Sequence, residues 1–243
     1  MSKQYDKSNL ASFSVNDSSI EIIIEGSQKN IRKAIKLNDS IKKEIKSIYE
    51  YTLNYIEQLK NAGINLPRII ESNHTDEEII FICEYVGENI TDYVHPDRFE
   101  DTLKNKQIFQ FIFDCLKKAQ IADINFDPHP KNYVMNEGVM TYVDFTPPWH
   151  QDYYDLRTFN SSSYQEKRVM EEFFRCFHPD EIGYHLAGDL MKMHFNIYPL
   201  LPLLYEELLR RNIISIGYSD FLSRAETIKN RELAREEKNI YLM

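Results

Sequence analysis

The pattern of apolar and polar positions predicts strands in the first third of the chain and mostly helices after it. Runs of β-branched and aromatic residues predict the strands, and they cover residues 11–15, 20–25, 31–37 and 78–86. A turn is expected over 16–19, and apolar residues at helical spacing predict one helix over 41–61, with Asn38-Asp39-Ser40 as its cap. Later helices are predicted over 99–121, 164–177, 179–194, 199–211 and 218–238. The sequence therefore predicts an α+β protein.

A short polar stretch separates the helix over 99–121 from the later helices. Residues 125–132 read Asn-Phe-Asp-Pro-His-Pro-Lys-Asn, a hairpin with its turn over 136–138 follows, and Asp144 ends the second strand. Two prolines fix φ and remove backbone donors, so the path of the loop is largely set. Alone, each piece is an ordinary turn or strand end. In this order, the residues supply a carboxylate that can accept a hydroxyl proton, and amide and carboxylate oxygens that suit Mg²⁺.

This stretch resembles the catalytic loop of the protein-kinase-like superfamily, and is most similar to the aminoglycoside and choline phosphotransferases. Their loop usually reads His-Gly-Asp-Leu-His-Pro-Gly-Asn, followed by a strand and Ile-Asp-Trp or Ile-Asp-Phe. The matching positions are Asp127, His129, Pro130, Asn132 and Asp144. The departures are Asn125-Phe126 for His-Gly, Pro128 for Leu and Lys131 for Gly. An amide at position 125 supplies only part of the hydrogen bonding of the family histidine.

The resemblance implies a bilobal fold with ATP and Mg²⁺ between the lobes. The N-lobe would span residues 1–86, as a small antiparallel sheet plus one helix, and the mostly helical C-lobe 87–243. Asp127 would position and deprotonate the acceptor hydroxyl, and Asn132 and Asp144 would hold metal.

The resemblance also implies a nucleotide site in the first lobe. Ala-Ile-Lys at 34–36 resembles the Val-Ala-Ile-Lys strand of kinases, so Ala34 would line the adenine pocket and Lys36 would reach the α/β-phosphates. Alternation puts these two residues on one face of the strand and Lys33 on the other; a solvated lysine is the alternative. The helix over 41–61 should carry the partner of Lys36, with Glu50 preferred and Glu44 second.

Two further assignments follow the same resemblance. The backbone of the segment from Glu84 to Gly87, including Val86, would bind adenine as the hinge between the lobes. Asp155, in a segment similar to Asp-Pro-x-x-Asp-Leu, would brace the catalytic loop. The histidines of the later helices show no usable metal-ligand spacing.

The amino-acid composition limits the classes of partner and the environment expected for the protein. Acidic residues outnumber basic ones by 38 to 29, giving a formal net charge of −9, which argues against a nucleic-acid footprint. The three cysteines form no CxxC and are expected to be reduced and buried in a cytoplasmic protein. No apolar run approaches the roughly 18 residues of a membrane span, and the N-terminus does not resemble a signal peptide.

Together these observations favour an ATP-dependent transfer of phosphate to a hydroxyl of a small molecule. One alternative is a pseudokinase that binds nucleotide with little activity, motivated by Asn125 and the lack of a Gly-rich loop. Another is a protein kinase or nucleotidyl transferase, disfavoured by the short segment after Asp144 and the absence of Ala-Pro-Glu there. The acceptor stays open among aminoglycosides, amino alcohols, sugars and natural-product intermediates, and the oligomeric state is not predicted.

Overall fold

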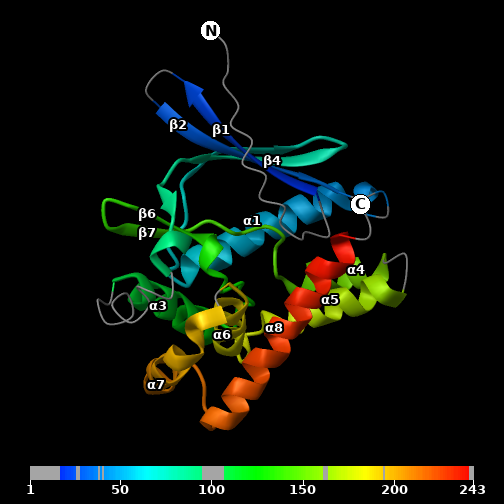
Figure 1. Ribbon diagram of the computed structural model, residues 1–243. Helices are drawn as coiled ribbons and strands as arrows, with labels where there is room; N and C mark the ends of the chain where they lie inside the picture. The colour runs from blue at the N-terminus through cyan, green and yellow to red at the C-terminus, as the bar shows by residue number, and fades with distance from the viewer. Residues whose placement is uncertain are drawn as a thin grey trace.

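The computed structural model describes residues 17–25, 28–37, 39, 41–94, 107–160, 164–193 and 195–240. Its first part is a four-stranded antiparallel sheet with strand order β1-β2-β4-β3, packed on the long helix α1 (Figure 1). The elements are β1 (Asp17–Glu25), β2 (Gln28–Lys36), α1 (Ile45–Asn61), β3 (Ile69–His74) and β4 (Glu78–Glu84), with a 3-10 turn over Lys42–Glu44.

Burial of one face of α1 against this sheet forms the first part of the core. The buried residues of α1 recur at helical spacing, as the sequence predicts: Ile45, Ile48, Thr52, Tyr55, Ile56 and Leu59. Ile35 of β2 and Leu37, which follows that strand, join the same cluster, and β4 contributes Ile79 and Phe81. The helix is followed by Gly63 at φ 78°, a backbone conformation that favours glycine.

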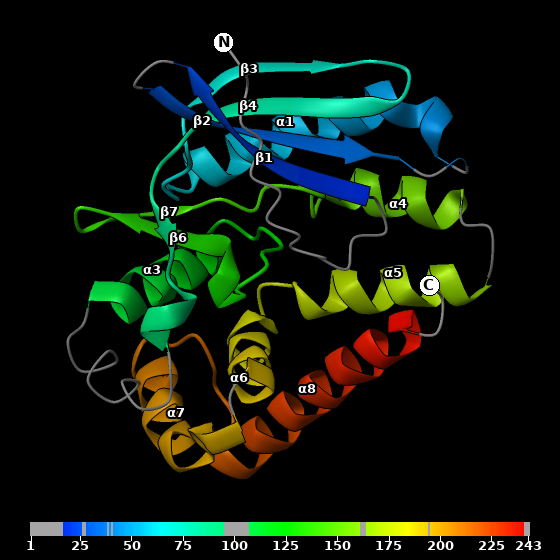
Figure 2. The ribbon, with the colours of Figure 1, turned by 45° about the horizontal axis from the view of Figure 1, so that its top comes forward.

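The second part contains a three-stranded sheet and the remaining helices (Figure 2). The strands are β5 (Glu88–Asn89), β6 (Tyr133–Asn136) and β7 (Val139–Tyr142), with order β5-β6-β7. The helices are α3 (Gln107–Ile121), α4 (Gln151–Phe159), α5 (Tyr164–Cys176), α6 (Ile182–Met193), α7 (Leu201–Arg210) and α8 (Tyr218–Ile240). Shorter 3-10 segments cover Thr91–Val94, Pro130–Asn132 and Phe195–Leu200.

Helix α6 is the centre of the helical part, with every residue from Ile182 to Met191 buried. Its Gly188 lies so close to α8 that an added Cβ would come within 2.8 Å of the Ile228 side chain and 2.9 Å of the Ala225 carbonyl oxygen. A glycine at this position therefore sets the close approach of the two helices.

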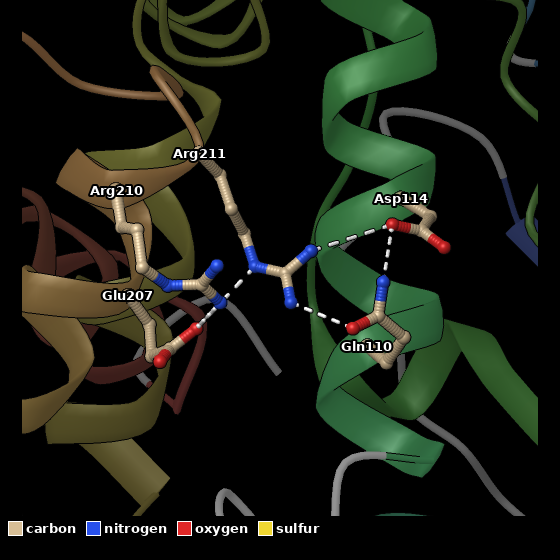
Figure 3. Close-up of polar contacts among 5 residues, drawn as sticks. All are labelled: Gln110, Asp114, Glu207, Arg210 and Arg211. Carbon is tan, nitrogen blue, oxygen red and sulfur yellow. Dashed lines mark hydrogen bonds and ion pairs between the residues drawn. The ribbon is translucent and has the colours of Figure 1, made fainter.

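A polar network joins the C-terminal end of α7 to α3 (Figure 3). The Arg211 guanidinium donates to the Gln110 side-chain oxygen at 2.7 Å, lies 3.5 Å from an Asp114 carboxylate oxygen, and stacks 5.0 Å from the centre of the Phe113 ring. Arg210, one residue earlier, contacts only Glu207 of its own helix among the residues drawn. Arg211 thus fixes α7 against α3 by packing as well as charge.

The structure confirms the α+β class and four of the predicted C-terminal helices, with ends that differ by a few residues. The three cysteines are buried and form no disulfide with one another, as predicted. Among the described residues, none of the helices is long and apolar enough to cross a membrane. The predicted strand over 11–15 and the start of the helix over 99–121 lie outside the described residues.

Other local predictions were wrong. Ser18 and Ser19, expected in a turn, belong to β1, because their backbone pairs with Ile35 and Ala34 of β2. Asn38 and Ser40, two of the expected capping residues, lie outside the described part of the chain; the residue before α1 is Glu44, which makes no side-chain cap hydrogen bond. Helix α4 was not predicted.

Candidate functional site

The loop between α3 and β6 folds back on itself around Asp127. The Asp127 carboxylate accepts a hydrogen bond from the His129 backbone N–H at 3.0 Å, and His129 Nδ1 accepts from the Lys131 N–H at 3.0 Å. The Asp127 carbonyl oxygen accepts from the Tyr142 hydroxyl at 3.2 Å and from Asn132 Nδ2 at 3.4 Å. Such side-chain bonds to nearby backbone groups are the usual stabilisation of proline-rich turns.

The start of the loop is anchored to two helices. The Tyr55 hydroxyl of α1 donates to the Asn125 carbonyl oxygen at 2.8 Å. The backbone N–H of Phe126 donates to the Phe177 carbonyl oxygen at 2.8 Å, and Asn125 Nδ2 lies 3.4 Å from the Phe174 carbonyl oxygen, near the C-terminal end of α5. Asn125 therefore braces the loop through both its backbone and its amide, at the position where the resembling family carries histidine.

Asn132 and Asp144 are brought together by the β6–β7 hairpin. Tyr133 pairs with Tyr142 at the end of the ladder, and the next bond runs from the Val143 N–H to the Asn132 carbonyl oxygen at 2.8 Å. Asp144 follows directly, so the two predicted metal ligands leave the hairpin at the same end. Asn132 is buried and Asp144 is half-buried.

The strongest polar contact of the site joins the two parts of the molecule. Lys33 Nζ of β2 lies 2.9 Å from the Asp144 carboxylate, with side-chain exposures of 10% and 22%. The same ammonium group lies 5.0 Å from the centre of the Phe145 ring, and Phe145 packs edge-on against Phe81 of β4 at 5.3 Å. A lysine in such surroundings is held by a carboxylate, a ring face and an apolar wall.

The prediction that the Lys36 side chain points towards the site was wrong. Lys36 is exposed at the end of β2, whereas Lys33 is 8% exposed and faces Asp144. Strand alternation places Lys33 on the same face as Ile35 and Leu37, which belong to the core. Ala34, also buried, lies on the opposite face from Lys33 and pairs with Ile80.

The predicted glutamate partner was wrong as well. Glu50 is exposed on α1, and Glu44 precedes the first turn of that helix. Neither glutamate forms an ion pair with any described residue, and the carboxylate that meets the buried lysine is Asp144 instead.

The predicted hinge is a short connection between β4 and β5. Glu84 ends β4, where its backbone N–H donates to the Arg68 carbonyl oxygen at 2.9 Å and its exposed carboxylate lies 3.2 Å from Arg68 Nε. Val86 is half-buried. Gly87 has φ 125°, and an added Cβ would lie 2.3 Å from the Met135 carbonyl oxygen, so the segment passes directly over β6.

Burial and charge shift the titration of the loop. Burial, and then the negative charge of Asp144, raise the pKa of Asp127 to about 6. Burial, and then the charge of Lys131, hold the pKa of His129 well below its usual range. The pKa of Asp127 is therefore near the range that suits a proton acceptor at neutral pH.

Sequence reasoning missed two residues that lie against Asp127. His185 and Asp189 stand one turn apart on α6, and one ligand atom from each, together with one from the Asp127 carboxylate, lies within 4.8 Å of the others. Burial, and then the charge of Asp127, raise the pKa of Asp189 well above its usual range. Two polar residues inside the otherwise apolar helix were the available signal.

Asp155 does not brace the loop. It is exposed on α4, and its carboxylate accepts a hydrogen bond from Gln151 of the same helix at 2.7 Å. The aspartate that the fold places beside Asp127 is Asp189.

Comparisons of this chain with protein-family models and with curated proteins found no match.

Proposed function

We propose that the chain is an ATP-dependent phosphotransferase with a kinase-like arrangement of two lobes, which transfers the γ-phosphate to a hydroxyl of a small molecule. The observation that carries this proposal is the Lys33–Asp144 contact, because it joins a sheet lysine to the carboxylate that follows the hairpin, beside Asp127. Phosphoryl transfer needs positioning and charge neutralisation more than covalent help, and these residues supply both.

In this proposal Asp127 accepts the proton of the acceptor hydroxyl, and Lys33, in place of Lys36, holds the α/β-phosphates. The backbone from Glu84 to Val86 is proposed to border the adenine. Ala34 was predicted to line the same pocket, but it lies on the opposite face of β2 from Lys33 and is not part of the proposed site. The donors fit Mg²⁺: the Asn132 amide nitrogen is directed to the Asp127 carbonyl, which leaves its side-chain oxygen for a cation, and Asp144 adds a carboxylate. When bound, Mg²⁺ would neutralise charge on the phosphates.

The pseudokinase remains the second candidate. Asn125 favours it, because the resembling enzymes have histidine there. Against it stands the finding that Asn125 still braces the loop through Tyr55 and α5. A protein substrate is less favoured, because helix α4 begins at Gln151, only seven residues after Asp144, and leaves a short intervening segment.

The lysine assignment is tested by a matched pair of variants. Lys33→Met should weaken binding of Mg·ATP by roughly 10- to 100-fold, because a charge-assisted contact to phosphate is lost. Lys36→Met, three residues along the same strand, should leave the affinity nearly unchanged. Calorimetric titration of both variants measures this, and the reverse order of effects would restore Lys36 to the site.

A second pair of variants distinguishes phosphoryl transfer from nucleotide binding. Asp127→Asn should keep Mg·ATP affinity and lower turnover at least about 100-fold, because the proton acceptor is lost. Asp144→Asn should instead weaken Mg²⁺-dependent binding. A metabolite-library screen for ATP consumption supplies the acceptor, with Asp127→Asn as the control. A wild-type protein that binds Mg·ATP but turns over no acceptor favours the pseudokinase; one that binds no nucleotide contradicts both candidates.

A further inference from the structure

Beneath the loop, Asp127 lies beside two side chains that the proposed phosphotransfer does not require. Asp127 comes from the loop, and His185 and Asp189 come from α6. His185 Nε2 lies 3.4 Å from Asp189 Oδ2, and these two residues are 3% and 1% exposed. We call these residues the Asp-His-Asp cluster.

The second observation concerns Asp189 alone. Its Oδ2 is buried, and apart from the ion-pair contact of His185 Nε2 at 3.4 Å it has no hydrogen-bond partner in the described part of the chain. A carboxylate oxygen withdrawn from water without a donor is costly, so such atoms normally meet a proton or a cation. The nearby Asp127 carboxylate adds a second negative group on the same side.

We propose that the Asp-His-Asp cluster is a binding site for a divalent transition-metal ion of the Zn²⁺ class. Zinc at about 2.1 Å from each ligand in tetrahedral geometry places ligand atoms roughly 3.4 Å apart. The His185–Asp189 pair already has this spacing. The Asp127 carboxylate, on a half-buried loop residue, has an oxygen within 4.8 Å of both ligand atoms and would move closer to complete the site.

The donor set selects the class of ion. One imidazole and two carboxylates suit zinc and its neighbours, whereas Mg²⁺ and Ca²⁺ prefer oxygen ligands alone. The cluster is therefore distinct in chemistry from the all-oxygen pair of Asn132 and Asp144. Three protein ligands leave one position of a tetrahedral ion open to solvent or to a small anion.

The site has a consequence that rests on the proposed function. Asp127 belongs to both sites, and a carboxylate bound to zinc cannot accept the proton of an acceptor hydroxyl. Occupancy of the cluster then switches off transfer while nucleotide binding through Lys33 and Asp144 continues.

The test uses the full chain, freed of metal by a chelator and kept in excess Mg²⁺ so that the oxygen sites are filled. Co²⁺ is titrated by its visible d–d absorption and Zn²⁺ by calorimetry. One Co²⁺ per chain, displaced by Zn²⁺, is expected. His185→Asn and Asp189→Asn should each weaken binding at least about 100-fold. His178→Asn, an exposed histidine outside the cluster, should not.

Each outcome of this test either supports or overturns the proposed metal site. Absence of a stoichiometric Co²⁺ spectrum in the wild-type protein overturns the site, as does unchanged affinity in folded His185→Asn protein. Should both α6 variants fail to fold, Asp127→Asn replaces them, because that side chain lies in a loop and its amide keeps the bond from His129. Lys33→Met reports on nucleotide only, so failure of the proposed function leaves a different pattern from failure of the metal site.

Discussion

Single residues of this site are defined by how their charges are compensated. Lys33 has a carboxylate and a ring face as partners, whereas Asp127 has a backbone N–H on one side and two further acidic groups near it. The fold therefore opposes the ionisation of Asp127. Its pKa of about 6 follows from burial first and from Asp144 second.

This shift predicts a pH-dependent cost to stability. The folded pKa lies above that of an exposed aspartate, so between about pH 4 and pH 6 the unfolded chain releases this proton first. The contribution of Asp127 to the free energy of unfolding is greatest at low pH and is lost as the pH rises towards 6. The side chain of Asp127→Asn cannot ionise. The difference in unfolding free energy, variant minus wild type, should therefore increase by about 1 to 3 kcal/mol as the pH rises over that interval. Denaturant unfolding at a series of pH values measures the difference, and a constant difference would contradict the assignment.

At the scale of elements, the connection from β4 to β5 depends on one glycine. Gly87 combines φ 125° with a close approach to the backbone of β6. A side chain there meets both steric strain and a fixed carbonyl, neither of which a rotamer change relieves.

Gly87→Ala should therefore destabilise the protein by about 2 to 4 kcal/mol. Gly138→Ala is the matched control, since its φ is 81° but nothing lies within 4 Å of the added Cβ; it should cost about 1 kcal/mol. Thermal and denaturant unfolding compare the two. Equal losses would show that φ alone, and not the contact with Met135, sets the cost.

The same scale shows which features the sequence predicts. Helical periodicity identified α1, α3 and α5 to α8, because each buries one face or, for α6, nearly all of it. The turn at Ser18 and Ser19 was mispredicted because polar residues there are held in a strand by pairing with β2, a tertiary effect that local propensity does not contain. Helix α4 lacks a clear apolar stripe, with only Tyr153 and Arg157 buried.

For the candidate site, the order of loop residues was sufficient to predict that Asp127, Asn132 and Asp144 lie together. Lys33 was recoverable as well, because it interrupts the apolar face formed with Ile35 and Leu37. The cluster with α6 was not: spacing puts His185 and Asp189 on one helix face, but only the packing of α6 under the loop decides what they meet.

At the scale of the whole molecule, several polar contacts among the described residues join the sheet and α1 to the helical part. Besides Lys33–Asp144, they include the Tyr55 hydroxyl on the Asn125 carbonyl and the Asn65 side chain on the Met140 carbonyl at 2.7 Å. The backbone adds a bond from the Tyr142 N–H to the Asn65 carbonyl oxygen at 2.9 Å. These contacts converge on the loop and the hairpin, so the site lies where the two parts meet.

Removing one of these contacts should affect stability and site together. Tyr55→Phe leaves the Asn125 carbonyl without its buried donor and should cost about 1 to 2 kcal/mol. It should also weaken Mg·ATP binding, because the loop loses its tie to α1. Tyr205→Phe removes a comparable hydroxyl bond to the Ile216 carbonyl, within the C-terminal helices. This control should lower stability without changing affinity; equal effects of both variants on binding would contradict the coupling.

The ion pair of Lys33 and Asp144 also bears on the order of arrival of the ligands. In the nucleotide-free protein, the Lys33 ammonium already neutralises the Asp144 carboxylate. A bare Mg²⁺ ion must displace this ammonium group to reach the carboxylate, so its binding gains little free energy. An incoming Mg·ATP complex offers the lysine new phosphate oxygens while it offers the aspartate a metal, so the two exchanges offset each other. On the proposed function, metal and nucleotide should therefore enter as one complex, and the free protein should bind Mg²⁺ alone much more weakly than it binds Mg·ATP.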